Sequence, residues 1–404
     1  MIDDKQNLSV EIDVQWHDDL VTYKDRNFII KTNFWRDFYP EQLDYQIKRA
    51  ELNQTIDINY KPGALLQFEI TPANIKTIPL TKFDSYANGP IPIQPMVGRF
   101  YPRGMLDGVD DCFKMDNRPF RVLEKTHNTL KVDLNHPLGT FPIKLSATIT
   151  DVFDANQQNG GRCNDIAETI TTNGPGFQIL LSDTPFDFSQ GMPFIRKIED
   201  DDAVFYESID STSPIVDRVA IEQLKQFYLE HLKDNSSILD LMAGPDSYLP
   251  DSLENLDVTG LSIKKQDLQS NPVLSQQTLH DLNKQPELPY NDQQFDTVVC
   301  AFSVEYMTQP IKVFKEAARI LKPGGSFLIS FSERFYEQKV IALWDDLHLF
   351  ERMGIVLEYF RQSDKFDKLQ TESTRGLIRH DDDPFVNKTV HSCPMYMVSG
   401  KKKA

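Results

Sequence analysis

The residues of this chain that are best suited to chemistry follow short apolar stretches in its C-terminal half. Asp240 ends one such stretch, and the turn Ala243-Gly244-Pro245 comes directly after it. Backbone N–H groups in such a turn can hold a carboxylate, and an acid at a strand end can accept hydrogen bonds from an amine or a hydroxyl. The candidate site residues are Asp240, Met242, Ala243, Gly244, Ser262, Asp281, Leu282, Ser303, Glu305 and Tyr306.

The elements that must position these residues alternate between strands and helices. Strands are expected at 237–241, 256–261, 295–302 and 326–331, with helices at 214–232, 311–321 and 337–362 and a last hairpin of 366–373 and 394–401. Ser213 and Pro214 suit the cap and first turn of the first helix. Alternating strands and helices imply a parallel, doubly wound sheet, in which ligands bind beyond the carboxyl ends of the strands.

The turn after Asp240 is poor in glycine. The stretch from Met242 to Tyr248 holds one glycine, where a dinucleotide-binding turn uses three. A pyrophosphate needs a closer approach of the backbone than a carboxylate does. The turn therefore disfavours a nicotinamide dinucleotide as ligand.

Residues from about 204 to 400 resemble the class I S-adenosylmethionine (SAM)-dependent methyltransferases of the broad type 11 group. The resemblance is closest to a subgroup whose first motif reads Asp-Leu-Met-Ser-Ser. The pieces that carry it are Ile238-Leu239-Asp240-Leu241-Met242, Ser247-Tyr248-Leu249-Pro250, Val258-Thr259-Gly260-Leu261, Asp281-Leu282-Asn283, Phe295-Asp296, Ser303-Val304-Glu305-Tyr306 and Lys322-Pro323-Gly324-Gly325.

This resemblance assigns roles to the candidate residues and implies SAM as cofactor. Asp240 and the 242–247 loop should face the methionine part, and Asp281 should accept from the adenine amino group with Leu282 beside the ring. Residues 303–306 should face methyl donor and acceptor, with Glu305, Tyr306 and His280 as the nearest candidates for catalysis. Relatives carry an acid after the second strand to hold the ribose, but this chain has Leu261-Ser262-Ile263 there. Ser262 and Lys264 are then the candidates for ribose binding.

Residues 8–155 look β-rich, with strands expected at 8–14, 27–33, 55–60, 66–70, 129–133 and 143–152 and a helix at 40–49. The stretch Asn135-His136-Pro137-Leu138-Gly139 resembles the end of FKBP-type prolyl isomerases of the SlyD-like kind. This resemblance implies an α+β FKBP-like domain with an insertion at about 79–121. Residues 156–213 are expected to form an ordered connector, because they are too apolar for a disordered linker, with phenylalanines at 177, 186, 188, 194 and 205. A prolyl-peptide pocket would use Tyr23, Phe38, Tyr39 and Leu145, unless these are plain core residues. His136 should fix its loop through a hydrogen bond and bind no metal.

The composition of the chain narrows the classes of partner and ligand that it is expected to bind. A net charge of −17 and a pI near 4.9 disfavour nucleic acid and anionic membrane surfaces. Four scattered cysteines without a Cys-x-x-Cys pair disfavour zinc and indicate a reducing compartment. The acidic runs at 200–202 and 381–383 are expected to be solvated turns, so no metal site is predicted. A polar start without an apolar segment, in a chain without long apolar runs, favours a cytoplasmic protein, and the combined resemblance is to bacterial proteins.

Two functions remain open. The first is a SAM-dependent methyltransferase with an FKBP-like accessory domain, acting on an unidentified acceptor such as a protein or peptide. The second is a prolyl isomerase or chaperone-type binding protein whose methyltransferase-like domain no longer turns over. The missing acid after the second strand and the glycine-poor turn motivate the second hypothesis.

Overall fold

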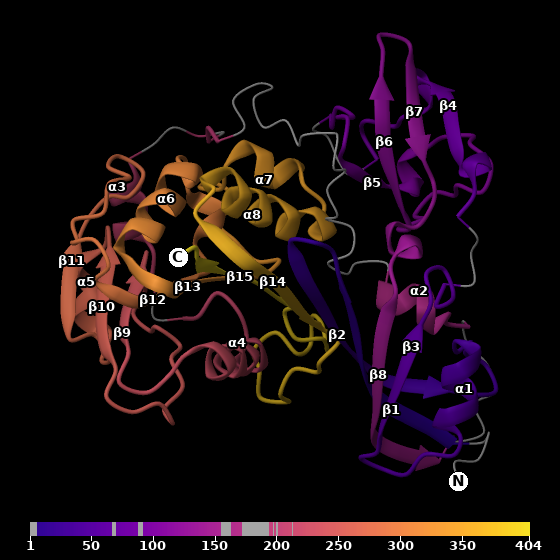
Figure 1. Ribbon diagram of the computed structural model, residues 1–404, viewed down its shortest axis with the longest axis horizontal. Helices are drawn as coiled ribbons and strands as arrows, with labels where there is room; N and C mark the ends of the chain where they lie inside the picture. Colours follow the sequence, from indigo (N-terminus) through magenta and orange to yellow (C-terminus); the bar gives the residue numbers. More distant parts are fainter. Residues whose placement is uncertain are drawn as a thin grey trace. The chain divides into compact units, whose positions relative to one another are not determined.

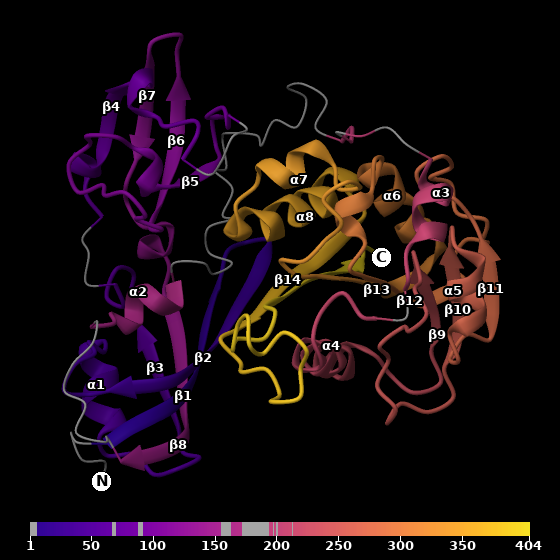
Figure 2. The ribbon, with the colours of Figure 1, turned by 180° about the vertical axis from the view of Figure 1, so that it is seen from behind.

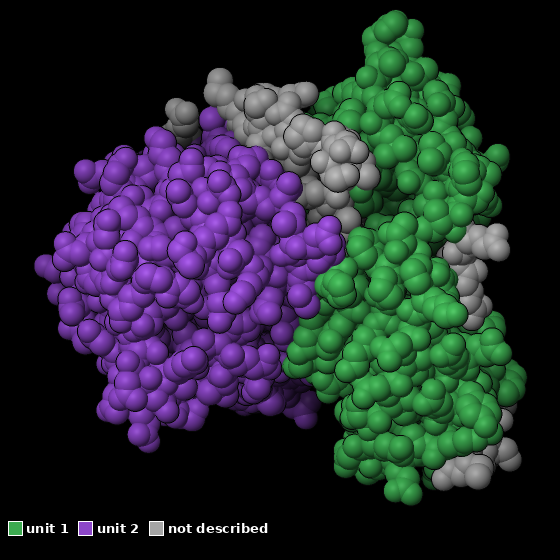
Figure 3. Space-filling model, in the orientation of Figure 1, with its two compact units in different colours: residues 1–17, 23–188, 348–354 green, residues 18–22, 189–347, 355–404 purple. Residues whose placement is uncertain are grey.

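The computed structural model describes residues 6–66, 70–87, 92–154, 163–171, 194–196, 198, 201–211 and 213–404. The chain forms two compact units (Figures 1 and 3). Unit 1 comprises residues 1–17, 23–188 and 348–354, and unit 2 comprises residues 18–22, 189–347 and 355–404. Most of the predicted connector 156–213, including 172–193, lies outside the described residues, and each unit is described by itself below.

Unit 2 is built on a seven-stranded run in the order β11-β10-β9-β12-β13-β15-β14. Strands β9 to β13 pair in parallel, and β15 pairs antiparallel with both β13 and β14. The strands are β9 Ser237–Leu241, β10 Asp257–Ser262, β11 Gln276–Leu279, β12 Phe295–Ala301, β13 Leu321–Phe331, β14 Phe366–Arg375 and β15 Met395–Lys402. The predicted doubly wound sheet and its closing hairpin are therefore confirmed.

Helices cover both faces of this sheet. Figures 1 and 2 show α6, α7 and α8 on one side and α4 on the other. The helices are α3 Asp202–Ser208, α4 Arg218–His231, α5 Lys265–Ser270, α6 Pro310–Ile320, α7 Ala342–Asp346 and α8 Leu349–Ser363. Of α8, residues 355–363 belong to unit 2. Phe314 of α6 packs edge-on against Phe327 of β13, with ring centroids 4.9 Å apart. Helix α4 buries Leu224 and Phe227 in a core that includes Ile238 and Val299. Burial of these apolar stripes is what holds the layers together.

Three expectations for unit 2 need correction. Helix α4 begins four residues after Pro214, because the carboxylate of Asp217 accepts the N–H of Ala220 and caps the helix. The long helix predicted at 337–362 is two helices, α7 and α8. Strand β11 escaped prediction because its sequence Gln-Gln-Thr-Leu is polar, as suits a strand at the edge of a sheet.

Unit 1 contains an antiparallel sheet in the order β2-β1-β8-β3, with β1 and β3 pairing on either side of β8. Its strands are β1 Gln6–His17, β2 Val21–Asn33, β3 Thr55–Tyr60 and β8 Ile143–Asp154, with helices α1 Glu41–Ile47 and α2 Ile166–Thr171. Alternate residues of β1, such as Val10, Ile12 and Val14, are buried. This period of two is what predicted the strands.

A second, smaller sheet lies between β3 and β8 in the sequence. It has the order β4-β7-β6-β5, with β4 Ile75–Pro79, β5 Phe100–Pro102, β6 Pro119–Lys125 and β7 Thr129–Asp133. Phe83, Tyr101 and Phe120 meet in its own core. Residues 79–87 and 92–121, in the stretch predicted as a loop or a small inserted subdomain, belong to this ordered part of the chain. Of the strand predicted at 66–70, Leu66 and Ile70 are not in a strand, and 67–69 lie outside the described residues.

Candidate functional site

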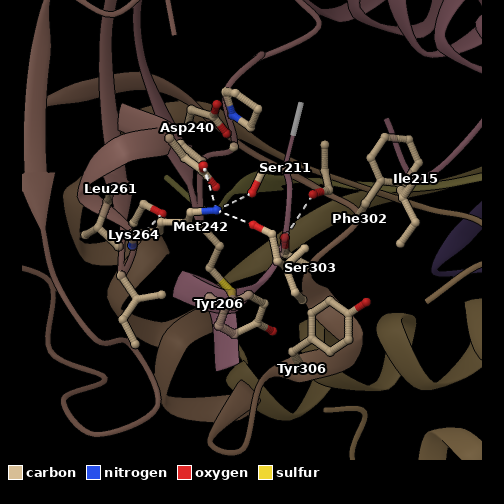
Figure 4. A pocket seen from close by; sticks show the side chains of 18 of the residues that line it. Tyr206, Ser211, Ile215, Asp240, Met242, Leu261, Lys264, Phe302, Ser303 and Tyr306 are labelled. Atoms are coloured by element: carbon tan, nitrogen blue, oxygen red, sulfur yellow. Dashed lines mark hydrogen bonds and ion pairs between the residues drawn. The ribbon is translucent and has the colours of Figure 1, made fainter. Parts of the chain in front are cut away.

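A cleft opens at the carboxyl ends of the parallel strands of unit 2. Residues after β9, β10, β11 and β12 line it together with residues 202–215 (Figure 4). The cavity within it has a volume of about 160 Å³ and opens to the surface. Clefts at this position of an α/β sheet are where small ligands bind.

The turn after β9 is held by a buried polar network. Ser247 donates its hydroxyl to Asp240 Oδ2 at 2.6 Å, and Asn271 Nδ2 donates to Ser247 Oγ at 2.9 Å and to the carbonyl of Gly244 at 3.0 Å. Burial raises the pKa of Asp240 to about 7. The carboxyl group of Asp240 therefore holds the turn in place through Ser247, and the turn lines the cleft.

The predicted residues of this turn line the cleft, but one backbone N–H of the turn is bonded within the sheet and cannot serve a ligand. Asp240, Met242, Ala243 and Gly244 all line the hollow. Met242 has a φ of +61°, a left-handed conformation that reverses the chain without a glycine. The N–H of Ala243 donates to the carbonyl of Leu261 at 2.8 Å. This N–H ties β9 to β10 and is already committed.

The end of β10 carries no acid, as the sequence indicates. Ser262 lines the cleft, but its hydroxyl accepts the N–H of Lys264 at 3.3 Å. Lys264 is buried and its ammonium donates to the carbonyl of Ile209 and to Ser211 Oγ, both at 2.7 Å. It also lies 3.4 Å from Asp267 Oδ1 (Figure 4 shows the ammonium beside Ser211). A lysine thus occupies the position next to the missing acid.

The segment after β11 brings Asp281 and Leu282 to the cleft together, as predicted. Asp281 Oδ1 accepts the N–H groups of Asn283 and Lys284, both at 3.1 Å. These two bonds fix the carboxylate against its own turn. Leu282 is buried and supplies an apolar surface beside it.

Of the residues predicted after β12, two line the cleft and one does not. Ser303 and Tyr306 line the cleft, whereas Glu305 is 1% exposed and is not among the lining residues. Val304–Tyr306 form a 3₁₀ turn, in which residues three apart share a side and their neighbours point elsewhere. The expectation that Glu305 faces the reacting groups is therefore corrected, and Tyr306 remains.

Two tyrosines that the sequence reasoning missed complete the wall around Tyr306. Tyr206 of α3 and Tyr336 line the cleft, with ring centroids 6.4 and 6.1 Å from that of Tyr306. The hydroxyl of Tyr306 accepts the N–H of Tyr336 at 2.8 Å. Tyr206 and Tyr336 are far apart in the chain and carry no motif, so only the fold identifies them.

The segment before α4 is tied down by a buried acid. Asp202 accepts hydrogen bonds from Arg196, from Lys339 at 3.0 Å and from Asn283 at 3.2 Å. Burial works to raise the pKa of Asp202, but the bonds from Arg196 and Lys339 outweigh it and hold the pKa below its usual value. The interpretation of 200–202 as a solvated turn is thus wrong for Asp202. Asp201 caps α3 by accepting the N–H of Ala203, and Asp200 lies outside the described residues.

The four residues predicted to line a prolyl-peptide pocket in unit 1 differ in exposure. Tyr23, Tyr39 and Leu145 are buried core residues, while Phe38 is 64% exposed. Phe38 instead lines a shallow groove with Phe113 and Met115, two further exposed apolar side chains. The groove lies entirely within unit 1.

The role predicted for His136 is confirmed. The N–H of Leu138 donates to His136 Nδ1 at 3.2 Å, and this bond fixes the loop before β8. Burial lowers the pKa of His136 to about 3, so the ring is neutral. Among the described residues no group of three His, Cys, Asp or Glu side chains is arranged to hold a metal ion. None of the described helices has the length and apolar content that crossing a bilayer needs.

Comparisons with known proteins agree with this geometry. Residues 239–329 match a family described as "Methyltransferase domain". The chain is 35% identical over 104 residues to a ubiquinone/menaquinone biosynthesis C-methyltransferase of Bartonella tribocorum, covering 24% of this chain and 39% of that protein. It is 33% identical over 90 residues to a rat mitochondrial 2-methoxy-6-polyprenyl-1,4-benzoquinol methylase, covering 22% and 27%. The chain thus spans less than half the length of these curated relatives.

Among solved structures, a SAM-dependent methyltransferase from Aquifex aeolicus aligns with 50% of this chain and all of its own, at 14% identity and a TM-score of 0.33. The family match and the strand order together establish a methyltransferase domain with a class I fold in the C-terminal half. Its cofactor is S-adenosyl-L-methionine.

Proposed function

We propose that this protein transfers a methyl group from S-adenosyl-L-methionine to an acceptor that enters the cleft beside Tyr206, Tyr306 and Tyr336. The observation that carries the proposal is the open cleft, in which the strand-end residues after four parallel strands converge on one hollow. The hollow is lined by fixed polar groups at one end and by tyrosines at the other.

The turn after β9 is suited to the methionine end of the cofactor. The bonds from Ser247 to Asp240 and from Asn271 to Ser247 hold the turn in one shape. A turn that is ordered before the ligand arrives loses little conformational entropy on binding. This preorganisation takes the place of the glycines that other nucleotide-binding turns use.

The adenine end is suited to Asp281 and Leu282. Asp281 keeps a second oxygen, Oδ2, for an amino group, since Oδ1 accepts the two backbone N–H groups of its own turn. Oδ2 also lies 3.3 Å from the ammonium of Lys284, whose side chain is largely exposed. Leu282 would cover one face of the ring.

The cofactor supplies an activated methyl group, and the protein must align it with the acceptor. Burial raises the pKa of Tyr306 well above its ordinary value. Its hydroxyl therefore stays protonated and acts as a positioning donor. A base is needed only if the acceptor must lose a proton.

The acceptor we propose is a protein or peptide that unit 1 brings to the enzyme. The two named relatives match 24% and 22% of this chain, so their acceptors do not account for the rest of it. The exposed groove of Phe38, Phe113 and Met115 supports a binding role for unit 1. We propose that this unit is an FKBP-like module with β4–β7 as its insertion.

Calorimetric titration with SAM and with S-adenosylhomocysteine tests the cofactor site. Ligand at 100 times its dissociation constant should stabilise the protein by about 2.7 kcal/mol. Mass spectrometry of a cell extract incubated with methyl-labelled SAM should then show a labelled product only when the protein is added. Absence of binding heat and of a melting shift with both ligands would refute the proposal.

A folding helper with an inactive methyltransferase domain is the second candidate. The observation that favours it is Ser262 at the place of the ribose-binding acid. A protease-coupled prolyl-peptide assay on the full chain distinguishes the two, with Phe38→Ala as the groove variant. Prolyl isomerisation without any methylated product would favour the folding helper. The absence of prolyl isomerisation would rule that candidate out.

We propose a cytoplasmic location. Cys112, Cys163, Cys300 and Cys393 are all free thiols in the described residues. Free thiols persist in a reducing compartment. The acidic balance of the chain supports the further proposal that neither nucleic acid nor a membrane surface is its partner.

A further inference from the structure

No carboxylate stands at the end of β10 to accept hydrogen bonds from a ligand that carries two adjacent hydroxyls. Ser262 stands at the strand end, and its hydroxyl already accepts the N–H of Lys264. A vicinal diol offers two donors, which a carboxylate can accept as a pair. If the cleft holds a ribose, a carboxylate from another position should serve it.

Most carboxylates that line the cleft are committed elsewhere. Asp202 is held by Arg196, Lys339 and Asn283. Asp240 lies under the turn after β9 and accepts from Ser247, and Asp246 accepts the N–H of Tyr248 at 2.8 Å. Asp281 belongs to the segment after β11, the next strand along the sheet. None of these four stands at the end of β10.

Asp267 is the carboxylate that follows β10 most closely. It lies in the first turn of α5, five residues after the strand ends at Ser262, and it lines the cleft. Its side chain is 14% exposed, so it is sheltered but reachable. In the part of the chain that the structure describes, Lys264 is its one charged partner, through Oδ1.

Lys264 fixes the position of this carboxylate. Its ammonium has three donors, and they meet the carbonyl of Ile209, the hydroxyl of Ser211 and Asp267 Oδ1. The charge of Asp267 also contributes to the raised pKa of Tyr336 on the cleft wall, although burial is the larger cause. Asp267 and Tyr336 line the same cleft, so the carboxylate of Asp267 can act on a group bound there.

We propose that Asp267 accepts the hydrogen bonds of the two ribose hydroxyls of the cofactor, in place of the acid that β10 lacks. Lys264 is the positioning residue that holds Asp267 toward the cleft. The inference rests on the proposed function, because it assumes that a ribose enters this cleft. It assigns to α5 a role that a strand end fills in similar proteins.

The test is calorimetric titration of the full chain with S-adenosylhomocysteine and with its 2′-deoxy and 3′-deoxy forms. Asp267→Ala should weaken binding of S-adenosylhomocysteine roughly 10- to 100-fold, as expected for lost hydrogen bonds to a charged group. The wild type should lose affinity for each deoxy ligand. The variant should show little further loss, because the partner of the missing hydroxyl is already gone.

Two further variants keep the test decisive. Gln266→Ala changes an exposed neighbour on α5 that does not line the cleft and should bind like the wild type. Asp267→Asn keeps the shape of the side chain, so it serves if Asp267→Ala melts early. Its amide retains one acceptor oxygen, so the loss should be smaller than for Asp267→Ala. The loss should shrink further with each deoxy ligand, because each lacks one of the two hydroxyls.

The outcomes separate the two proposals. A wild type that binds none of the ligands overturns both the methyltransferase proposal and the ribose assignment. A wild type that binds S-adenosylhomocysteine while Asp267→Ala binds it equally well overturns only the ribose assignment. An equal loss for S-adenosylhomocysteine and the deoxy ligands also overturns it, since Asp267 would then act only by holding Lys264 and residues 209–211.

Discussion

Two groups of tyrosines, one in each unit, have different surroundings. In unit 1, Tyr23 stacks on Trp16 with ring centroids 5.1 Å apart, and the Tyr39 hydroxyl donates to Thr32. In unit 2, Tyr206, Tyr306 and Tyr336 surround a hollow, with Tyr206 and Tyr336 at 6.5 Å.

The difference follows from the two kinds of sheet. Alternate side chains of the antiparallel strands in unit 1 fill its buried face, so an aromatic residue there becomes core. The parallel strands of unit 2 end at one edge, where their loops diverge and leave space for a ligand. An aromatic residue is therefore a candidate for binding when it stands at such an edge, and its type alone is not enough.

The largest expected effect tests the core assignment in unit 1. Tyr23→Ala should lower the free energy of unfolding by about 3–5 kcal/mol, because it removes a buried ring and leaves a cavity. The affinity of the folded variant for S-adenosylhomocysteine should stay unchanged. Urea denaturation and calorimetric titration measure the two quantities, and an unchanged unfolding midpoint would show that Tyr23 is not core.

Asp281→Ala tests the ligand assignment in unit 2. It should weaken binding of S-adenosylhomocysteine by roughly 1–3 kcal/mol, since the adenine amino group loses a charged acceptor. Asp251→Ala is the matched control, because Asp251 is exposed and away from the cleft. If both variants bind S-adenosylhomocysteine with the same affinity, Asp281 does not contact the adenine.

Asp240→Asn tests the protonation state of the acid that holds the turn after β9, through the pH dependence of the free energy of unfolding. The pKa of Asp240 is about 7 when folded against an ordinary value of 3.8, so the folded state holds the extra proton between these values. Stability should therefore fall as pH rises from about 4 to about 7, by at most about 1.4 kcal/mol per pH unit from this group. The asparagine lacks this contribution, so the difference between wild type and variant should slope with pH in urea unfolding. A flat difference would contradict the buried, protonated state.

The smallest effect is expected for Phe38→Ala in unit 1. Phe38 is exposed, so the free energy of unfolding should change by no more than about 0.5 kcal/mol. Isomerisation of a prolyl peptide, if present, should drop in this variant because the groove loses an apolar wall. A variant that melts much earlier would place Phe38 in the fold and not in a binding surface.

The sequence by itself determined the architecture of unit 2 and the edge at which its site lies. Apolar stretches of strand length alternate with amphipathic helices, and this pattern depends on local periodicity alone. Asp240, Ser262 and Ser303 could be placed because they lie at or just after the ends of predicted strands. Asp281 follows β11, which was not predicted, and its assignment came from the family resemblance. In unit 1 the same periodicity located five of the eight strands in the part that the structure describes, whereas β4, β5 and β6 lack a clear pattern.

Only the tertiary structure decided which side chains share the cleft. It turned Glu305 away through a 3₁₀ turn, buried Asp202 among cations, and brought Tyr206, Tyr336 and Asp267 to the hollow from separate segments. Packing between distant segments sets these positions, and no local pattern encodes the direction in which a loop side chain points. The sequence therefore specified the edge of the sheet, and the fold specified the composition of the site.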